Sequence, residues 1–326
     1  MKKFLKILGI AVTVIVVLLL AGFVYFNIAF PDVDPAPDIK VELTADRIER
    51  GKYLANHVTV CIDCHSTRDW NKFSGPIVPG TEGKGGDKFG RDIGFPGDIF
   101  SKNITPASLN QWTDGEILRA ITCGVSKDGN ALFPIMPFPD YSKLSREDLY
   151  SIIAYIRTLK PVEGNYPAHD LDFPLNYIVK TMPIKNYSAP KEPDRNNAIA
   201  YGEYLVTVGG CNGCHTQTDK GTPIPGKTLA GGVNFDLPFG VLTSANLTPD
   251  TETGIGRWTK DFFIARFKAY ASDSAGIKNV ERNEFNTIMP WTMYAGMTEE
   301  DLGHIYDYLK TVKPVKNQVQ IFIPKK

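Results

Sequence analysis

The chain has 326 residues, of which 43% are hydrophobic and 22% charged, and this composition is typical of a folded protein. Its length allows two domains of ordinary size. The 36 Lys and Arg residues balance the 36 Asp and Glu residues, so nothing in the net charge indicates a nucleic-acid partner. We therefore expect folded domains without a nucleic-acid-binding function.

The N-terminus differs in kind from the rest of the chain. Lys2, Lys3 and Lys6 precede an uncharged run over residues 7–31 that is rich in Val, Ile, Leu and Phe. About 20 apolar residues span a bilayer, so we expect residues 1–31 to form a single transmembrane anchor. The lysines predict a cytoplasmic N-terminus, with the rest of the chain on the periplasmic (extracytoplasmic) side of the plasma membrane. A cleaved signal peptide is the alternative.

Beyond a proline-containing spacer over residues 32–43, the sequence repeats itself. Short strings recur in the same order and at nearly constant spacing: Gly51-Lys-Tyr-Leu with Gly202-Glu-Tyr-Leu, Asn103-Ile-Thr-Pro with Asn246-Leu-Thr-Pro, and Ile135-Met-Pro with Ile288-Met-Pro. An ordered set of this kind is hard to obtain by chance and indicates an internal duplication.

Signals for helices also recur in both halves. Thr44 is a candidate N-cap, and Thr113-Asp-Gly-Glu is a capping-box pattern. Ser145 and Thr298 each stand three residues before an acidic residue and should open the last helix of their half. Between the helices run loops rich in Gly and Pro, and alternating strand patterns are sparse. We therefore expect an all-α fold in which few helices surround a large cofactor.

These signals predict five regions: a transmembrane helix over residues 1–31, a spacer over 32–43, a first domain over 44–162, a connector over 163–197 and a second domain over 198–326. The connector contains five prolines and should be irregular. Its apolar residues, Phe173 and Tyr177 among them, are too many for a free tether. We expect it to pack across both domains.

The residues that can carry chemistry form a pentapeptide, Cys-x-x-Cys-His, that occurs once in each half. Its members are Cys61, Cys64 and His65 in the first copy and Cys211, Cys214 and His215 in the second. This pattern is typical of c-type haem attachment, in which two thioethers hold the porphyrin and the adjacent histidine binds the iron. Four of the five cysteines fall in these copies, which favours two covalent haem c groups over disulfides, a redox dithiol or zinc.

Each iron then needs a sixth ligand, and Met136 and Met289 are the candidates that occupy equivalent places in the repeat. Each is followed by proline and an aromatic residue, Phe138 and Trp291 respectively. Proline fixes φ and removes a backbone donor, which gives a stiff loop suited to presenting a weakly binding thioether. The alternative is that both methionines only fill apolar gaps.

Other candidate ligands are weaker because none recurs in the other half; they are Met182, Met293, Met297, His57, His169 and His304. We interpret the three histidines as surface or packing residues, with His169 as an alternative ligand. Cys123 is expected to be a small buried residue without a catalytic role. Asn103 and Asn246 recur and should hydrogen-bond either a loop or a haem propionate.

Together these motifs resemble two class I-type cytochrome c domains in tandem. Their order is similar to that in the cytochrome subunits of membrane-bound quinoprotein and flavoprotein dehydrogenases, which serve alcohol- or sugar-oxidising subunits. The resemblance covers nearly all of the chain after the spacer. It implies that Gly51 and Gly202 lie where the first helix of each domain crosses the last, near Tyr155 and Tyr308. Those subunits commonly carry three haems, whereas this chain has two motifs.

With both irons six-coordinate, the chain should relay single electrons and catalyse no reaction of its own. We expect a donor on the dehydrogenase or quinol side, and a terminal oxidase or soluble cytochrome of the respiratory chain as acceptor. Met/His ligation raises the haem potential, which suits this direction. No small-molecule substrate is expected. The alternative is a dihaem peroxidase, which would need an open iron site and a nearby acid/base residue.

Overall fold

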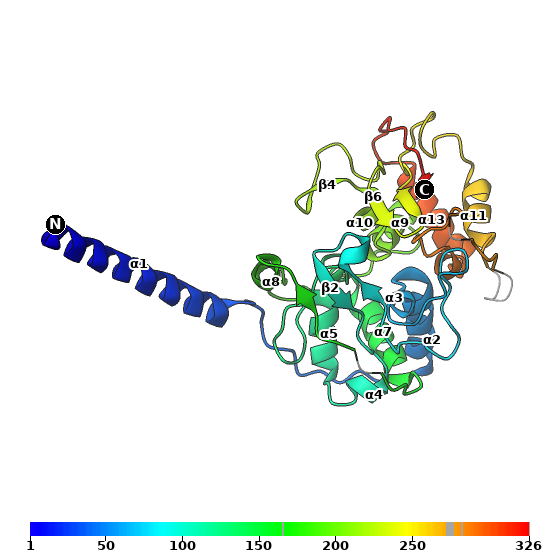
Figure 1. Cartoon of the computed structure of the whole chain (residues 1–326). Helices are drawn as coiled ribbons and strands as arrows, with labels where there is room; N and C mark the ends of the chain where they lie inside the picture. Colours follow the sequence, from blue (N-terminus) through cyan, green and yellow to red (C-terminus); the bar gives the residue numbers. More distant parts are fainter. Residues whose placement is uncertain (165, 272–276, 282, 326) are drawn as a thin grey trace.

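Helix α1 (Lys2–Ala29) extends away from a body that contains all the other elements (Figure 1). None of its residues is buried, and it is long and apolar enough to cross a membrane. At 1.5 Å per residue it is about 42 Å long, more than the roughly 30 Å of a hydrocarbon core. The computed structural model describes four stretches of the chain: residues 1–164, 166–271, 277–281 and 283–325.

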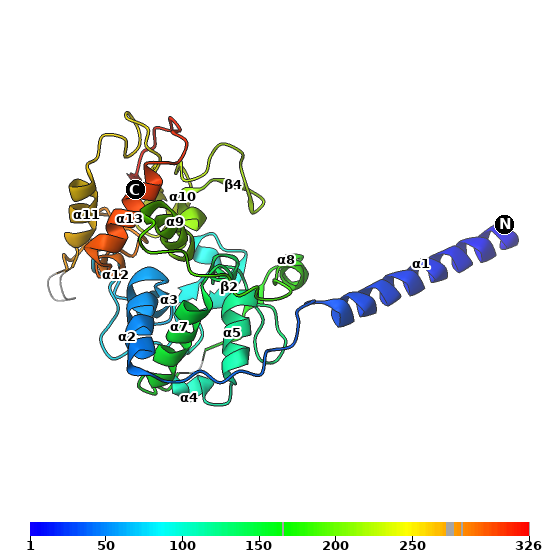
Figure 2. The same cartoon turned by 180° about the vertical axis from the view of Figure 1, so that it is seen from behind.

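The body consists of two groups of helices, which lie one above the other in both views (Figures 1 and 2). The N-terminal half contains α2 (Ala45–Tyr53), the π-helical turn η1 (Leu54–Val58), α3 (Cys61–Cys64), α4 (Pro106–Leu109), α5 (Asp114–Cys123), α6 (Phe138–Tyr141) and α7 (Arg146–Thr158). The C-terminal half contains α9 (Ala198–Val208), α10 (Cys211–His215), α11 (Lys260–Lys268), α12 (Trp291–Tyr294) and α13 (Glu299–Leu309). Between them lie α8 (Leu175–Ile178) and the short 3₁₀ turn η3 (Val179–Thr181).

Three small antiparallel sheets accompany the helices, and the expectation of an all-α fold did not include them. They are β1 (Lys88–Phe89), β2 (Gly97–Phe100) and β3 (Asp170–Leu171); β4 (Thr218–Asp219) and β5 (Thr222–Pro223); and β6 (Asn234–Leu237), β7 (Gly240–Thr243) and β8 (Phe322–Pro324). The short 3₁₀ turn η2 (Arg91–Ile93) lies between β1 and β2. Because the strands have only two to four residues, the sheets fasten loops and do not form a layer of the core.

The predicted helix starts are confirmed. The side-chain oxygens of Thr44, Ser145 and Thr298 each accept a hydrogen bond from a backbone amide in the first turn of α2, α7 and α13. Thr113 and Glu116 form the complete capping box of α5. These caps satisfy amides that the helices themselves leave without partners.

In each half the first long helix crosses the last at a glycine, as the family resemblance implied. A Cβ atom added to Gly51 in α2 would lie 1.8 Å from the carbonyl oxygen of Ser151 in α7. One added to Gly202 in α9 would lie 2.0 Å from the carbonyl oxygen of His304 in α13. Only glycine allows the two backbones to approach this closely. One buried apolar cluster then runs through both halves, from Val41 to Leu309.

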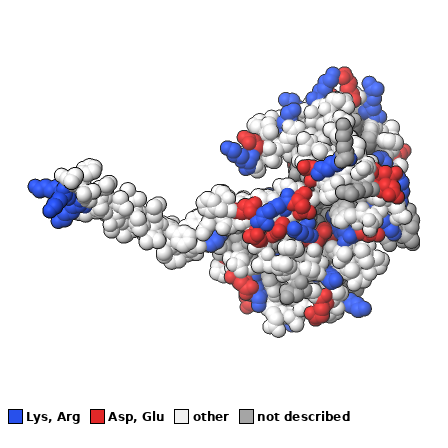
Figure 3. All heavy atoms as spheres, in the orientation of Figure 1, with Lys and Arg blue, Asp and Glu red and all other residues white. Residues whose placement is uncertain are grey.

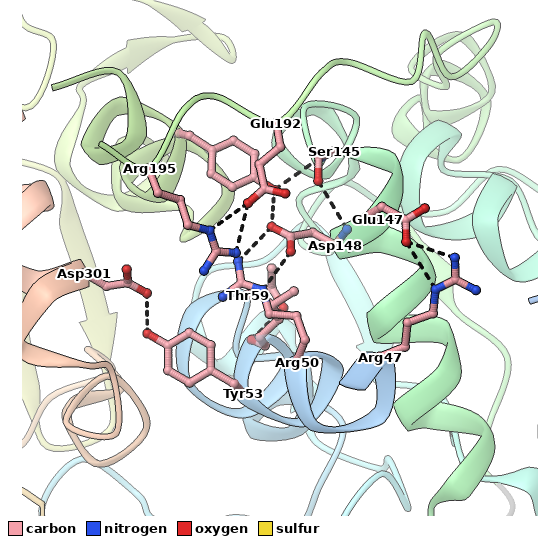
Figure 4. Close-up of polar contacts among 12 residues, drawn as sticks. Arg47, Arg50, Tyr53, Thr59, Ser145, Glu147, Asp148, Glu192, Arg195 and Asp301 are labelled. Carbon is pink, nitrogen blue, oxygen red and sulfur yellow. Dashed lines mark hydrogen bonds and ion pairs between the residues drawn. The ribbon is translucent and has the colours of Figure 1, made fainter. Parts of the chain in front are cut away.

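The two halves make equivalent contacts across their interface, and Figure 4 shows the contact between Tyr53 and Asp301. Tyr53 on α2 donates to Asp301 Oδ2 of the C-terminal half at 2.5 Å, and the Thr298 amide donates to the Tyr53 hydroxyl at 3.2 Å. In the opposite direction, Tyr204 on α9 donates to Asp148 Oδ2 at 2.7 Å.

The amide of Ser145, the N-cap of α7, donates to the Tyr204 hydroxyl at 3.2 Å. This contact is equivalent to that between the Thr298 amide and the Tyr53 hydroxyl. Arg50 adds a salt bridge to Asp148 at 2.8 Å, and the Asp148 carboxylate is 2% exposed. Each first helix therefore contacts the N-terminus of the other half's last helix, which is the pattern of a twofold-related pair.

His57 is a further contact between the halves. Its Nδ1 lies 2.8 Å from the carbonyl oxygen of Met293 in α12, and a carbonyl can only accept, so Nδ1 carries the proton. Gly296 leaves room for the ring, because an added Cβ would lie 2.1 Å from His57 Nδ1. The interpretation of His57 as a packing residue agrees with these contacts.

The connector contacts both halves. Its strand β3 pairs with β2, with Leu171 opposite Gly97, and the Tyr187 hydroxyl donates to the carbonyl of Leu144 at 2.7 Å. At its far end, the guanidinium of Arg195 lies 5.2 Å from the ring centroid of Tyr201 in α9.

Replacing Gly202 with alanine should destabilise the protein, because α9 and α13 must separate to admit the new Cβ atom. Overpacking of this kind costs roughly 1–3 kcal/mol in the free energy of unfolding. Gly303→Ala, within α13, is the matched control, since its nearest neighbour would lie at an ordinary 3.6 Å. That variant should be neutral or stabilising by roughly 0.5–1 kcal/mol. Equal effects of both variants in denaturant unfolding followed by circular dichroism would contradict the crossing.

Acidification should weaken the interface through His57. Burial lowers the pKa of His57 below its ordinary value of 6.5, with nearby Lys268 and Lys52 acting in the same direction. Below pH 6.5 the unfolded chain therefore binds a proton at His57 more readily than the folded protein does. The free energy of unfolding should fall as the pH is lowered through 6.5. His57→Gln retains a donor for the Met293 carbonyl and cannot titrate.

Denaturant unfolding at several pH values should give a shallower pH dependence for His57→Gln than for the wild type. The difference is at most one proton, about 1.4 kcal/mol per pH unit. Parallel stability curves for the two proteins would show that His57 does not contribute.

Candidate haem sites

The first motif consists of α3 and its C-cap His65, and it begins shortly after the buried turn η1. Val60, the residue before α3, adopts the left-handed conformation at φ 45°. His65 Nδ1 lies 2.6 Å from the carbonyl oxygen of Lys102, so Nδ1 carries the proton and Nε2 carries the lone pair. Burial lowers the pKa of His65 below 6.5 and keeps the imidazole neutral. A neutral imidazole with one nitrogen fixed by a carbonyl is the usual arrangement of a metal-binding histidine.

The second motif has the same local geometry. Gly210 precedes α10 in the left-handed conformation at φ 69°, and His215 Nδ1 lies 2.7 Å from the carbonyl oxygen of Ala245. Burial lowers the pKa of His215 as well. The backbone carbonyl of each histidine accepts a glycine amide, from Gly85 at 2.7 Å in the first half and Gly231 at 2.8 Å in the second.

The loops that supply these carbonyls are fastened by the recurring asparagines. Asn103 Nδ2 donates to the carbonyl of Val162 at 2.7 Å, and Asn246 Nδ2 donates to that of Val315 at 2.7 Å. The Oδ1 atoms of both asparagines accept from the threonine two residues on. Of the two roles considered from sequence, these asparagines therefore hold loops, and they tie each loop to the segment that follows the last helix.

A cavity of about 1690 Å³ adjoins the first motif. Five of the predicted site residues line it: Cys61, Cys64, His65, Met136 and Cys214. It exceeds the roughly 300–1,000 Å³ of a typical small-molecule pocket, and its walls include apolar residues of β2, α5 and β6. The two thiols of the first motif, the neutral imidazole of His65 and the thioether of Met136 around one large and mostly apolar cavity fit a covalently attached haem. The third thiol, of Cys214, comes from the second motif. The lining does not include Cys211, His215 or Met289.

The residues of the motifs fit a zinc site poorly. Burial raises the pKa values of Cys64 and Cys211 to about 12, so both side chains are thiols when no group is bound. Within the four described stretches, no group of three or more His, Cys, Asp or Glu side chains is arranged to hold a metal ion.

The two methionine loops share a backbone conformation. Pro137 follows Met136 with φ −77° and ψ 58°, and Pro290 follows Met289 with φ −79° and ψ 62°. In each loop the methionine carbonyl accepts from the amide two residues on, at 2.7 and 2.8 Å. The repeat therefore extends to the conformation of the candidate ligand loops.

The Met289 loop is also held from the N-terminal half, a feature that sequence analysis missed. Ser74 Oγ donates to the Met289 carbonyl at 2.6 Å and accepts from the Trp291 amide at 3.0 Å. Asn286 Oδ1 in turn accepts from the Ser74 amide at 2.9 Å. No sequence signal links Ser74 to a methionine in the other half of the chain.

Two further residues that sequence analysis missed are Tyr141 and Tyr294, each five residues after its methionine. Their hydroxyls donate to the carbonyls of Thr59 at 2.6 Å and Gly209 at 2.7 Å, just before the two motifs. Burial raises both tyrosine pKa values well above 10, so the hydroxyls stay protonated as donors.

The two motifs lie close to one another at these tyrosines. After burial, the groups that raise the pKa of Tyr294 are the thiols of its own motif, followed by Asp63 and Cys64 of the other motif. A Cβ added to Gly209 would lie 3.5 Å from the carbonyl oxygen of Val58. Both motif helices therefore start at the interface between the halves.

The rival ligands have other environments. Met293 and Met297 are buried in apolar clusters, and the ring of His304 packs edge-on against Tyr201. His169 does line the cavity, and its Nδ1 accepts from the Phe100 amide at 3.3 Å, so it stays an alternative ligand. Met182 lies outside the cavity lining. Cys123 is buried at 3% exposure, as expected for a packing residue.

Comparisons with known proteins agree with the motifs. Residues 199–313 match the sequence model of the Cytochrome c family. The chain is 29% identical over 286 residues to the cytochrome c subunit of the quinone alcohol dehydrogenase of Gluconacetobacter polyoxogenes, covering 82% of this chain and 56% of that subunit.

Two other relatives have a similar degree of identity. The fructose dehydrogenase cytochrome subunit of Gluconobacter japonicus is 31% identical, covering 76% of this chain and 49% of the relative. A dihaem c-type cytochrome of Cereibacter sphaeroides is 26% identical, covering 78% of this chain and 83% of the relative. The chain thus spans about half the length of the dehydrogenase subunits. It contains a cytochrome c domain and is homologous to the cytochrome c subunits of alcohol and fructose dehydrogenases and to a dihaem cytochrome c.

Proposed function

We propose that this chain is a membrane-anchored dihaem cytochrome c. It relays single electrons from a donor on the dehydrogenase or quinol side to a terminal oxidase or a soluble cytochrome. The observation that carries the proposal is the cavity in which both cysteines of the first motif, the neutral imidazole of His65 and the sulfur-bearing side chain of Met136 come together. The relatives, which are named as subunits of alcohol and fructose dehydrogenases, support this function.

In this proposal each half is one haem domain, over residues 44–162 and 198–326, and the two arose by duplication. Cys61 and Cys64 hold the first haem c and Cys211 and Cys214 the second. His65 with Met136, and His215 with Met289, bind the two irons. The haem iron, when bound, supplies the one-electron chemistry. The equivalent carbonyl contacts of the two histidines and the equivalent conformations of the two methionine loops support the assignment.

The chain's own residues position the side chains that would bind the two irons. The carbonyls of Lys102 and Ala245 orient the imidazoles, and the proline loops limit movement of the thioethers. Helix α1 anchors the chain in the plasma membrane with Lys2, Lys3 and Lys6 on the cytoplasmic side, which places the haem domains in the periplasm.

Haem content tests the cofactor assignment directly. The full chain, produced in a host that attaches c-type haem, should carry two covalent haems per chain in a pyridine haemochrome assay and in its intact mass. Replacing both cysteines of one motif with alanine should lower the content to one haem, whichever motif is chosen. A wild-type content of one haem would contradict the assignment of the second motif.

The methionine assignment is tested by spectra of volume-conserving variants. Met136→Leu or Met289→Leu should each make one haem high-spin, remove its sulfur-to-iron absorption at the red edge of the visible spectrum and lower its potential. Met293→Leu and Met297→Leu are matched controls, since both side chains are buried in apolar clusters and should leave the spectra unchanged. Unchanged spectra in both ligand variants would remove the assignment. Cyanide binding by the wild-type protein would favour the peroxidase.

A further inference from the structure

Part of the connector lies against the end of helix α1. In both views α8 stands between the body and the last turns of α1 (Figures 1 and 2). The ring of Tyr177 packs edge-on against Phe23 and Phe26, with centroid distances of 6.0 and 6.4 Å. Lys180 Nζ donates to Asn27 Oδ1 at 2.7 Å. Contacts with three residues of the last two turns fix the level of α8 along the helix.

The chain is fastened again where it leaves α1. Lys185 forms a salt bridge with Asp32 at 2.8 Å, and its carbonyl accepts from the Asp34 amide at 2.8 Å. The salt bridge is exposed and contributes little stability by itself. The backbone hydrogen bond together with the ring contacts nevertheless holds the connector beside the exit of the helix.

The depth of this contact follows from the sequence of α1. Lys6 is the last charge before the apolar run, so the hydrocarbon core begins near Ile7. A bilayer core takes roughly 20 residues of helix, which brings its outer boundary to about Phe26. Asn27, the next residue, is polar. Tyr177 packs on Phe23 and Phe26 and therefore lies at the outer boundary, where tyrosine rings are enriched in membrane proteins.

At this level the connector exposes large apolar side chains. Phe173 is 81% exposed and Ile178 is 45% exposed, and the ring of Phe173 packs edge-on against Tyr177 at 6.3 Å. The opposite face of the same segment is inward: Val179 is buried, and Asn176 and Val179 line the large cavity. Helix α1 is uncharged beyond its N-terminal lysines (Figure 3). Charged residues flank the connector segment: Asp170 and Asp172 precede Phe173 and pair with Arg91, and Lys180 follows Ile178.

We propose that residues 173–178 form a second membrane contact, in which Phe173 and Ile178 insert into the outer boundary of the bilayer beside α1. The occupant of this apolar patch is lipid, because the patch continues the lipid-facing surface of α1 at the depth where the hydrocarbon core ends. With α1 as the only membrane contact, the body could change its orientation relative to the bilayer plane, whereas a second contact fixes that orientation.

One consequence concerns the cavity, and it rests on the proposed function. Since Asn176, Val179 and Lys180 line the cavity beside the first motif, the second contact places one wall of this cavity next to the bilayer. The haem of the N-terminal half would then be the one closer to a redox partner that resides in the membrane.

The test uses the full chain in phosphatidylcholine nanodiscs that contain a lipid with a diazirine in its acyl chain. After illumination, mass spectrometry of peptides should find lipid adducts in α1 and in residues 171–180. It should find none around Phe262 on α11, whose side chain is 52% exposed but belongs to the other half. The adducts show which residues lie close to the lipid acyl chains, and this result depends neither on bound haem nor on activity.

Variants sharpen this result. Phe173→Asp combined with Ile178→Asp should reduce labelling of residues 171–180 several-fold and leave the labelling of α1 unchanged. Phe262→Asp is the matched control and should change neither, and far-ultraviolet circular dichroism should be the same for all three proteins. Labelling of α1 without the connector would overturn the second contact while the anchor stands. Labelling of neither segment would overturn the anchor as well.

Discussion

The site in each half depends on one hydrogen bond between a histidine Nδ1 and a loop carbonyl. That bond fixes the ring and leaves the lone pair on Nε2, the atom that is proposed to bind the iron. The carbonyl is in turn held in place, because the asparagine after it ties the loop to the segment beyond the last helix. The recurrence of Asn-x-Thr-Pro in the two halves thus has a structural cause. Through this asparagine, the segment after the last helix of each half helps to hold the histidine ring in its orientation.

The interface between the halves provides further contacts that hold the two candidate sites in place. Tyr53 and Tyr204 each reach the N-terminus of the other half's last helix, and the motif helices start beside that interface. Ser74 of the first half also fastens the Met289 loop of the second. This contact connects the loop of a candidate iron ligand in one half to a backbone segment of the other half.

Sequence reasoning could predict those parts of the molecule that recur. The motifs and the caps at Thr113 and Ser145 could be predicted because each residue pattern has a well-defined physical use, and the crossing glycines followed from the family resemblance. The sheets were missed because their strands have two to four residues, too short for an alternating pattern. Tyr53 and Tyr204 also recur at matching positions, yet the residues that they contact depend on how the two halves dock. Ser74 carried no signal at all, since its partner lies in the other half.

The central claim is that both irons are low-spin and coordinated by histidine and methionine in the native chain. A potentiometric titration followed by visible and low-temperature electron paramagnetic resonance spectra tests it most directly. The account predicts two one-electron steps per chain and two low-spin ferric signals, with the sulfur-to-iron absorption present in the oxidised protein. A single step, or a high-spin ferric signal from the intact wild-type protein, would contradict it.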